Sequence, residues 1–255
     1  MAKAQIEAIK LLKLIGWEKP GDLTLEEIAY YLKAIVNDTV MNGSQGRILM
    51  DENYAIISIN SEIDYLPKRN FVLAHEIGHL RLHNQILPLF SDNESTLNEW
   101  YKKGKHEEEA NEFASELLMP SNLFDSQVKG RIFDLSMIRE VASYFGSSQT
   151  ATLLKYRKVG DFPISIIFSK DGIVKWKAES DEFPLKYLPK GSKIQNQTAA
   201  SDFYKNGFLE EEPISLNPVH WFPEDFKIKD YLYDELKEQN FRIGKNGLLT
   251  CLWID

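Results

Sequence analysis

The sequence predicts an α+β protein, with a mostly helical first part that contains a small antiparallel sheet and a smaller, strand-rich second part. Three observations lead to this. Apolar residues recur at helical spacing over most of residues 1–160, and short β-type runs interrupt them between residues 39 and 61. After Gly160, strand-like runs joined by Asp-Gly and Asn-Gly turns dominate. We therefore expect two domains, residues 1–160 and 161–255.

Start and stop signals place the elements of the first part. Thr24 is a candidate N-cap and Glu27 completes a capping box, so a helix should start there, with Ile35 still at helical spacing. Pro67 opens another helix, and Pro120 stops the next one. The expected helices cover residues 1–17, from 24 onward, 67–83, 106–119, 135–145 and 148–158, with strands at 47–50 and 54–59 and a polar loop at 88–105.

The second part should begin with a hairpin. Residues 164–168 and 173–176 are strand-like and flank Asp171-Gly172, a strong two-residue turn signal. A second hairpin is expected at the end of the chain, from residues 241–243 and 248–254 around Gly247, after a charged helix at 225–238.

Charge and hydropathy exclude several classes of protein. A formal charge of -8 argues against broad electrostatic capture of DNA or RNA, so we expect no direct nucleic-acid binding. No run of eighteen apolar residues and no signal-peptide core is present, so we expect no membrane span and a cytoplasmic protein. The single cysteine, Cys251, cannot form an intramolecular disulfide, which fits a reducing compartment.

The main chemical signal is the string His75-Glu76-Ile77-Gly78-His79, an H-E-x-x-H sequence inside a predicted helix. Spacing of four residues puts both imidazoles on one helix face, where they can share a zinc ion. Glu76, beside the first ligand, is then placed to act as the general base toward a zinc-activated water. The alternative, two surface histidines that flank an unrelated glutamate, would leave costly polar groups on an internal helix.

A third protein ligand must come from another segment. His83 continues the helix, but it lies about 12 Å along the axis from His75, so we expect it to support or cap the site instead. The acidic run 106–112 is the better source, and Glu107 is the best candidate because it shares a face with the small Ala110. Glu108, Glu109 and Glu112 remain alternatives, and for any single glutamate of this run, Glu107 included, a solvated acidic face at a helix N-terminus is the plainer interpretation.

Residues 70–80 and 107–120 together resemble the ImmA/IrrE family of metallopeptidases. The paired strings are N-F-V-L-A-H-E-I-G-H-L and E-E-E-A-N-E-F-A-S-E-L-L-M-P. The resemblance implies a zincin-like core in which His75, His79 and Glu107 bind zinc and Glu76 is the catalytic base. It covers roughly residues 24–160, including a helix-turn-helix-like segment at about 134–158 that we interpret as scaffold.

The resemblance also implies a function. Members of the family typically cleave a helix-turn-helix transcriptional repressor and so switch on stress, mobile-element or defence genes, which makes such a repressor the expected protein partner. The alternative is an antitoxin-like regulator that keeps the fold but acts by protein contact alone. Residues 161–255 would then sense a small-molecule or protein signal or recognise the substrate, although their aromatic residues equally fit an ordinary core. Tyr156 or Arg157 could stabilise an oxyanion, but positions on a helix surface are the plainer expectation.

Overall fold

The computed structural model describes residues 2–51, 53–83, 89–93 and 104–254. Within these ranges the chain forms eight α-helices and two β-sheets, so the α+β class is confirmed. The chain divides into two compact units, Met1–Gln127 with Val141–Ala151, and Val128–Glu140 with Thr152–Asp255. Across the described residues, no helix combines the length and the apolar character needed to cross a membrane.

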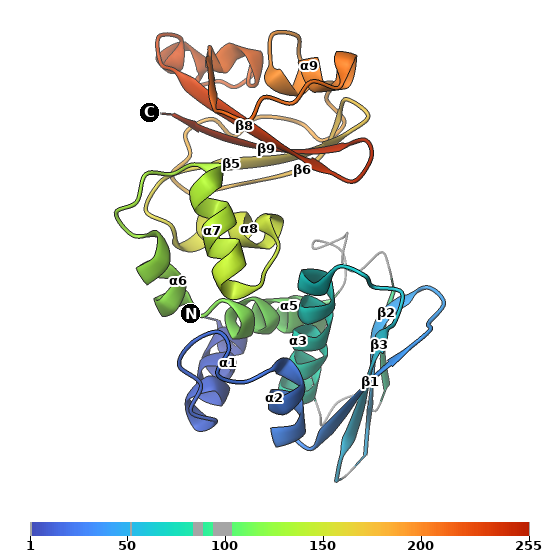
Figure 1. Ribbon diagram of the computed structural model, residues 1–255. Helices are drawn as coiled ribbons and strands as arrows, with labels where there is room; N and C mark the ends of the chain where they lie inside the picture. The colour runs from blue at the N-terminus through green and yellow to red at the C-terminus, as the bar shows by residue number, and fades with distance from the viewer. Residues whose placement is uncertain (1, 52, 84–88, 94–103, 255) are drawn as a thin grey trace. The chain divides into compact units, whose positions relative to one another are not determined.

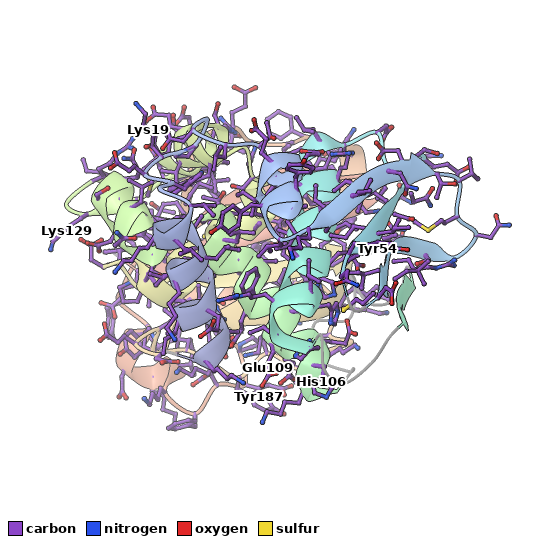
Figure 2. All side chains as sticks on the ribbon, turned by 90° about the horizontal axis from the view of Figure 1, so that it is seen from below. Lys19, Tyr54, His106, Glu109, Lys129 and Tyr187 are labelled. Atoms are coloured by element: carbon purple, nitrogen blue, oxygen red, sulfur yellow. The ribbon has the colours of Figure 1, made fainter. Side chains whose placement is uncertain are left out.

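The first unit packs helices against a four-stranded sheet (Figure 1). Helix α3 carries the H-E-x-x-H string, and it contacts α5 as well as strands β2 and β3. Near the start of α5, His106 and Glu109 lie close together (Figure 2). The elements are α1 (Lys3–Leu14), α2 (Leu25–Tyr31), β1 (Ala34–Thr39), β2 (Ser44–Met50), β3 (Ala55–Asn60), α3 (Leu66–His83), β4 (Leu89–Asn93), α5 (Lys105–Leu118) and α6 (Ser121–Val128).

Two expectations about the sheet and the helix that precedes it are wrong. Its strand order is β1-β3-β2-β4, and β1 pairs with β3 in parallel, so the sheet is mixed and not antiparallel. The helix at Thr24 has the predicted capping box, because the Glu27 amide donates to Thr24 Oγ1 at 3.2 Å. It ends at Tyr31, however. Lys33 takes a left-handed conformation with φ 61°, and Ile35 therefore belongs to a strand.

The predicted polar loop at residues 88–105 contains a further strand. Residues Leu89–Asn93 form β4, which pairs with β2 and lies at the edge of the sheet. A single short strand between polar segments gives too few alternating residues for the pattern to be read. The remainder of the predicted loop, apart from residues 104 and 105, lies outside the described residues.

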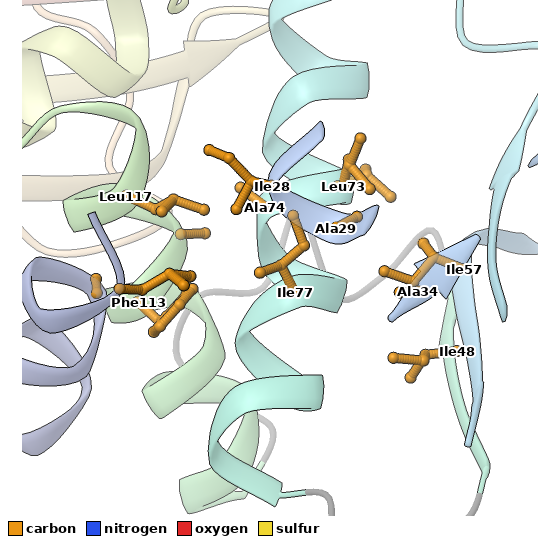
Figure 3. Close-up of a cluster of buried hydrophobic side chains, with 14 of the residues drawn as sticks. Ile28, Ala29, Ala34, Ile48, Ile57, Leu73, Ala74, Ile77, Phe113 and Leu117 are labelled. Carbon is orange, nitrogen blue, oxygen red and sulfur yellow. The ribbon is translucent and has the colours of Figure 1, made fainter. Parts of the chain in front are cut away.

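The core of the first unit holds α3 in place between α5 and the sheet (Figure 3). Ile77 faces this core, and Phe113 from α5 and Ile57 from β3 are likewise fully buried. Burial of one such side chain stabilises the fold by roughly 1.5–3 kcal/mol. The helix that carries the H-E-x-x-H string is therefore an internal, rigid element.

Gly78 lets α3 and α5 approach each other closely. A Cβ added at this position would lie 3.1 Å from the Ala110 carbonyl oxygen and 3.2 Å from Phe113 Cδ1. A side chain would therefore push the two helices apart. The absence of one brings the first turn of α5 within reach of the histidines of α3.

The second unit is built on an antiparallel five-stranded sheet with the order β6-β5-β9-β8-β7. Both predicted hairpins are confirmed, as β5–β6 and β8–β9. Its elements are β5 (Ser165–Lys170), β6 (Ile173–Glu179), α9 (Ala199–Asn206), β7 (Ile214–Leu216), the 3-10 turns η1 (Pro218–His220) and η2 (Ile228–Tyr231), β8 (Leu236–Ile243) and β9 (Gly247–Ile254). Helices α7 (Leu135–Phe145) and α8 (Gln149–Val159), both predicted, contribute residues to each unit.

The charged helix predicted at residues 225–238 is wrong. The buried carboxylate of Asp225 accepts hydrogen bonds from the backbone amides of Lys186 and Tyr187, both at 2.7 Å. These bonds fix a turn, and β8 starts at Leu236. Glu238 in β8 is fully buried and accepts from the Ala200 amide and the Trp221 indole. Asp225 and Glu238 thus serve long-range hydrogen bonds and do not lie on a solvated helix face.

Candidate metal centre

Helix α3 presents the two histidines of the H-E-x-x-H string on one face, as predicted. His75 and His79 are both 1% exposed, and their Nε2 atoms lie 3.0 Å apart. Two imidazole nitrogens this close, on a buried helix face, can contact the same ion.

Helix α5 places a carboxylate beside these two nitrogens. Glu107 Oε2 lies 3.3 Å from His75 Nε2, and Glu107 Oε1 lies 3.5 Å from His79 Nε2. The neighbouring Glu108 is exposed to solvent. Of the glutamates at the start of α5, Glu107 is therefore the one that the structure brings beside both histidines.

The spacing of the three groups fits a tetrahedral zinc ion. Ligand atoms at about 2.0–2.1 Å from zinc in tetrahedral geometry lie about 3.3–3.4 Å from one another. In this protein the two Nε2 atoms lie 3.0 Å apart, and the two carboxylate oxygens of Glu107 lie 3.3 Å from His75 Nε2 and 3.5 Å from His79 Nε2. Glu107 Oε2 is buried and has no hydrogen-bond partner of good geometry within the described residues, an arrangement that a cation would relieve. The three residues therefore fit a zinc ion with one position left for another ligand.

Asn111 fixes the tautomer of the first histidine. Its Oδ1 lies 2.9 Å from His75 Nδ1, and because an amide oxygen can only accept, Nδ1 carries the proton. Nε2 of His75, which carries the lone pair, faces Glu107 and His79. We did not single out Asn111 from the sequence. Its position four residues after Glu107, on the same helix face, was the available signal.

His83 supports the second histidine. His79 Nδ1 lies 3.1 Å from His83 Nδ1, and His83 Nε2 lies 3.0 Å from Glu109 Oε2. The consistent arrangement has His79 donating to His83 and His83 donating to the Glu109 carboxylate. This leaves Nε2 of His79 without a proton, as for His75. His83 therefore contacts a candidate ligand, in line with the supporting role expected for it.

Glu76 is buried against the sheet, with 1% of its surface exposed. Strand β2 passes so close that a Cβ added at Gly46 would lie 2.6 Å from Glu76 Oε1 and 2.6 Å from Val72 Cγ1. Gly46 therefore leaves the space that the Glu76 carboxylate occupies. Sequence reasoning missed this residue, because a glycine inside a strand run does not reveal which partner approaches it.

Electrostatics favour a neutral His79 beside an ionised Glu107. Burial lowers the pKa of His79, and the neighbouring His75 lowers it further, although the nearby Glu107 carboxylate opposes both effects. Burial raises the pKa of Glu107, but the nearby imidazoles of His75 and His79 outweigh this effect and hold the pKa well below its usual range. Neutral imidazole and ionised carboxylate are the forms that bind zinc.

The two candidates for oxyanion stabilisation lie in α8. Tyr156 is fully buried within the second unit, where its ring lies 4.9 Å from that of Phe133, so the expected surface position is wrong for it. Arg157 Nη1 donates to the Glu179 carbonyl oxygen at 3.4 Å. Both side chains thus have structural partners in the second unit.

Comparison with known proteins gives a family match, a related sequence and a similar structure. Residues 36–156 match the Peptidase_M78 family, described as the IrrE N-terminal-like domain. An immunity region protein 2 of Bacillus phage phi105 is 40% identical over 88 residues, which cover 34% of this chain and 52%, about half, of that relative. A transcriptional regulator of Mycobacterium tuberculosis has a similar structure, with a TM-score of 0.61 at 12% identity over all of this chain and 77% of that one. At this identity the structural likeness concerns the fold alone.

Proposed function

Residues 36–156 belong to the IrrE N-terminal-like family of metallopeptidases, and from this premise we propose that the protein is a zinc-dependent endopeptidase with a zincin-like core. One observation carries the proposal. The Nε2 atoms of His75 and His79 lie 3.0 Å apart, each has a carboxylate oxygen of Glu107 within 3.5 Å, and the H-E-x-x-H glutamate lies on the same helix as the two histidines.

In this mechanism His75, His79 and Glu107 hold the ion. When bound, zinc supplies a Lewis acid that polarises the peptide carbonyl and increases the acidity of water. Glu76 accepts a proton from the attacking water and returns it to the amine of the leaving product. Asn111 and His83 keep the proton of each ligand histidine on Nδ1, so that both Nε2 atoms stay available.

We further propose that the substrate is a helix-turn-helix transcriptional repressor whose cleavage switches on stress, mobile-element or defence genes in the cytoplasm. The similarity to a protein of a phage immunity region supports this class of substrate. The strand-rich C-terminal part, residues 161–255, is proposed to sense a signal or to recognise the substrate. Domain 1–160 would then contain the complete metal centre.

The experiment combines zinc content with cleavage of the repressor encoded beside this gene. The wild-type protein should contain one zinc ion per chain after passage over a weak chelating resin and should cut the repressor at a defined bond, seen by mass spectrometry. Glu76→Gln should keep the zinc and lose the cleavage. Glu107→Gln should lose both, whereas the matched control Glu108→Gln, at an exposed neighbour on the same helix, should keep both.

Each departure from this pattern has a definite meaning. Cleavage retained in Glu76→Gln would refute the proposed general base. Zinc retained in Glu107→Gln would refute the third ligand. If the wild-type protein binds the repressor without cutting it, and Glu76→Gln binds it equally well, the protein is a regulator that acts by contact and not an enzyme.

A further inference from the structure

A second cluster of metal-ligating side chains lies beside the candidate centre and shares no ligand residue with it. It consists of His83 at the end of α3 and of His106 and Glu109 near the start of α5. Figure 2 labels His106 and Glu109. Glu109 Oε2 lies 3.0 Å from His83 Nε2 and 3.9 Å from His106 Nδ1. The two imidazole rings meet edge to face, with centroids 4.5 Å apart.

We infer that His83, His106 and Glu109 form a second site for a divalent cation of the zinc type. Two imidazole nitrogens and one carboxylate oxygen are a donor set that zinc prefers, and a water can complete it. The Glu109–His83 separation is already close to the value for a tetrahedral ion, and the Glu109–His106 separation has to shorten by about 0.6 Å to reach it. The ligand atoms of all three residues lie within 4.8 Å of one another, so a movement of the partly exposed His106 can bring them to one ion.

Two features of the cluster point to a ligand. His106 Nδ1 is buried and has no hydrogen-bond partner within the described residues, so a potential donor or acceptor is left unsatisfied. The side chains of His106 and Glu109 are 42% and 26% exposed, so an ion can enter from solvent. The nearby Lys105 Nζ is 3.8 Å from Glu109 Oε1, but with 82% of its side chain exposed it can move away at little cost.

The second site is linked to the first through one hydrogen bond. His83 faces Glu109 with Nε2 and His79 with Nδ1. A neutral imidazole has one proton, and an ion that takes the Nε2 lone pair of His83 requires that proton to sit on Nδ1 of the same ring. Two N–H groups would then face each other between His83 and His79, and their hydrogen bond would be lost.

Filling the second site therefore weakens the first. Loss of an outer hydrogen bond to a ligand histidine typically reduces metal affinity by about 10–100-fold. This coupling rests on the proposed function, because it needs His79 to be a zinc ligand. The second site itself does not depend on that function. It would make excess zinc an inhibitor of the protein.

The first test is metal stoichiometry at saturating zinc, measured by equilibrium dialysis and elemental analysis of the full chain. The wild type should bind two ions, and His106→Ala and Glu107→Gln should each bind one. His220→Ala, which removes the histidine of the second unit, is the matched control and should bind two. Circular dichroism checks that each variant is folded. His106→Ala should fold normally, because the side chain of His106 is partly exposed.

The outcomes separate this inference from the proposed function. Two ions in His106→Ala, or equal stoichiometry in the wild type and His106→Ala, would overturn the second site. One ion in the wild type that is lost in His106→Ala and kept in Glu107→Gln would support the second site and refute the first.

The second test measures the coupling. Competition with a chromophoric chelator gives the two stepwise affinities of the wild type and the single affinities of His106→Ala and Glu107→Gln. The product of the wild-type affinities should be about 10-fold or more below the product of the two single affinities. Equal products would refute the antagonism.

Discussion

Gly46→Ala should impair catalysis without removing zinc. The added methyl group would lie 2.6 Å from Glu76 Oε1, and ordinary contact requires 3.4 Å, so the carboxylate or the strand must move by about 0.8 Å. The same methyl would meet Val72 Cγ1 at 2.6 Å, on the same face of α3 one turn earlier. The side chain of Glu76 is the softer of the two neighbours and should move first.

A displacement of this size is large for a general base. Misplacement of a reacting group by about 1 Å can cost about 10²-fold in rate. We therefore expect kcat for repressor cleavage to fall by about 10- to 100-fold. Zinc content should remain at the wild-type value, because Glu76 is not among the three grouped ligands. Overpacking should also lower the free energy of unfolding by about 1–3 kcal/mol.

The assay is repressor cleavage under saturating substrate, with zinc measured on the same preparations. Gly104→Ala is the matched control, because a Cβ there meets nothing within 4 Å. On a Glu76→Gln background, Gly46→Ala should cause no further loss of rate, since the group it displaces no longer acts as a base. An unchanged kcat in the single variant, or loss of its zinc, would refute the reasoning.

Three further predictions follow from buried polar contacts. Asn111→Ala should weaken zinc binding by about 10–100-fold in a chelator competition, because His75 loses its hydrogen bond, and Asn111→Asp should retain most of the affinity. The pKa of His79 is lowered on folding, so the unfolded state binds more protons than the folded state below pH 6.5. The melting temperature of the metal-free protein should therefore fall as the pH drops through that range, and a melting temperature that does not change with pH would contradict this. Glu238→Gln should destabilise the second unit by roughly 2–4 kcal/mol in denaturant titrations, because an amide NH2 would face N–H donors such as Trp221 Nε1; unchanged stability would contradict it.

Local signals in the sequence were enough to predict many elements. The H-E-x-x-H helix, the capping box at Thr24 and both turn-centred hairpins depend on residues within a few positions of one another, and all are present. The juxtaposition of Glu107 with His75 and His79 also follows a local rule, since it shares a helix face with the small Ala110.

The errors share a different cause. Strand β1 exists because it pairs in parallel with β3, a contact between segments that single-sequence spacing does not encode. The segment at 225–238 is held by Asp225, whose partners Lys186 and Tyr187 are almost forty residues away in the chain. Gly46 was missed for the same reason, because its role is set by Glu76 on another element.

The close packing of α3 on α5 has a consequence for how the chain can change in length. Glu107 precedes Ala110, the residue that contacts Gly78, by three positions, so the contact fixes the angle at which the carboxylate leaves the helix. One residue inserted between them would rotate Glu107 by about 100° about the helix axis and carry it away from His75. An insertion upstream of Gly104 would leave the spacing between Glu107 and Ala110 unchanged. Homologous chains should therefore vary in length before α5 and keep a constant count between this glutamate and the residue packed on the glycine.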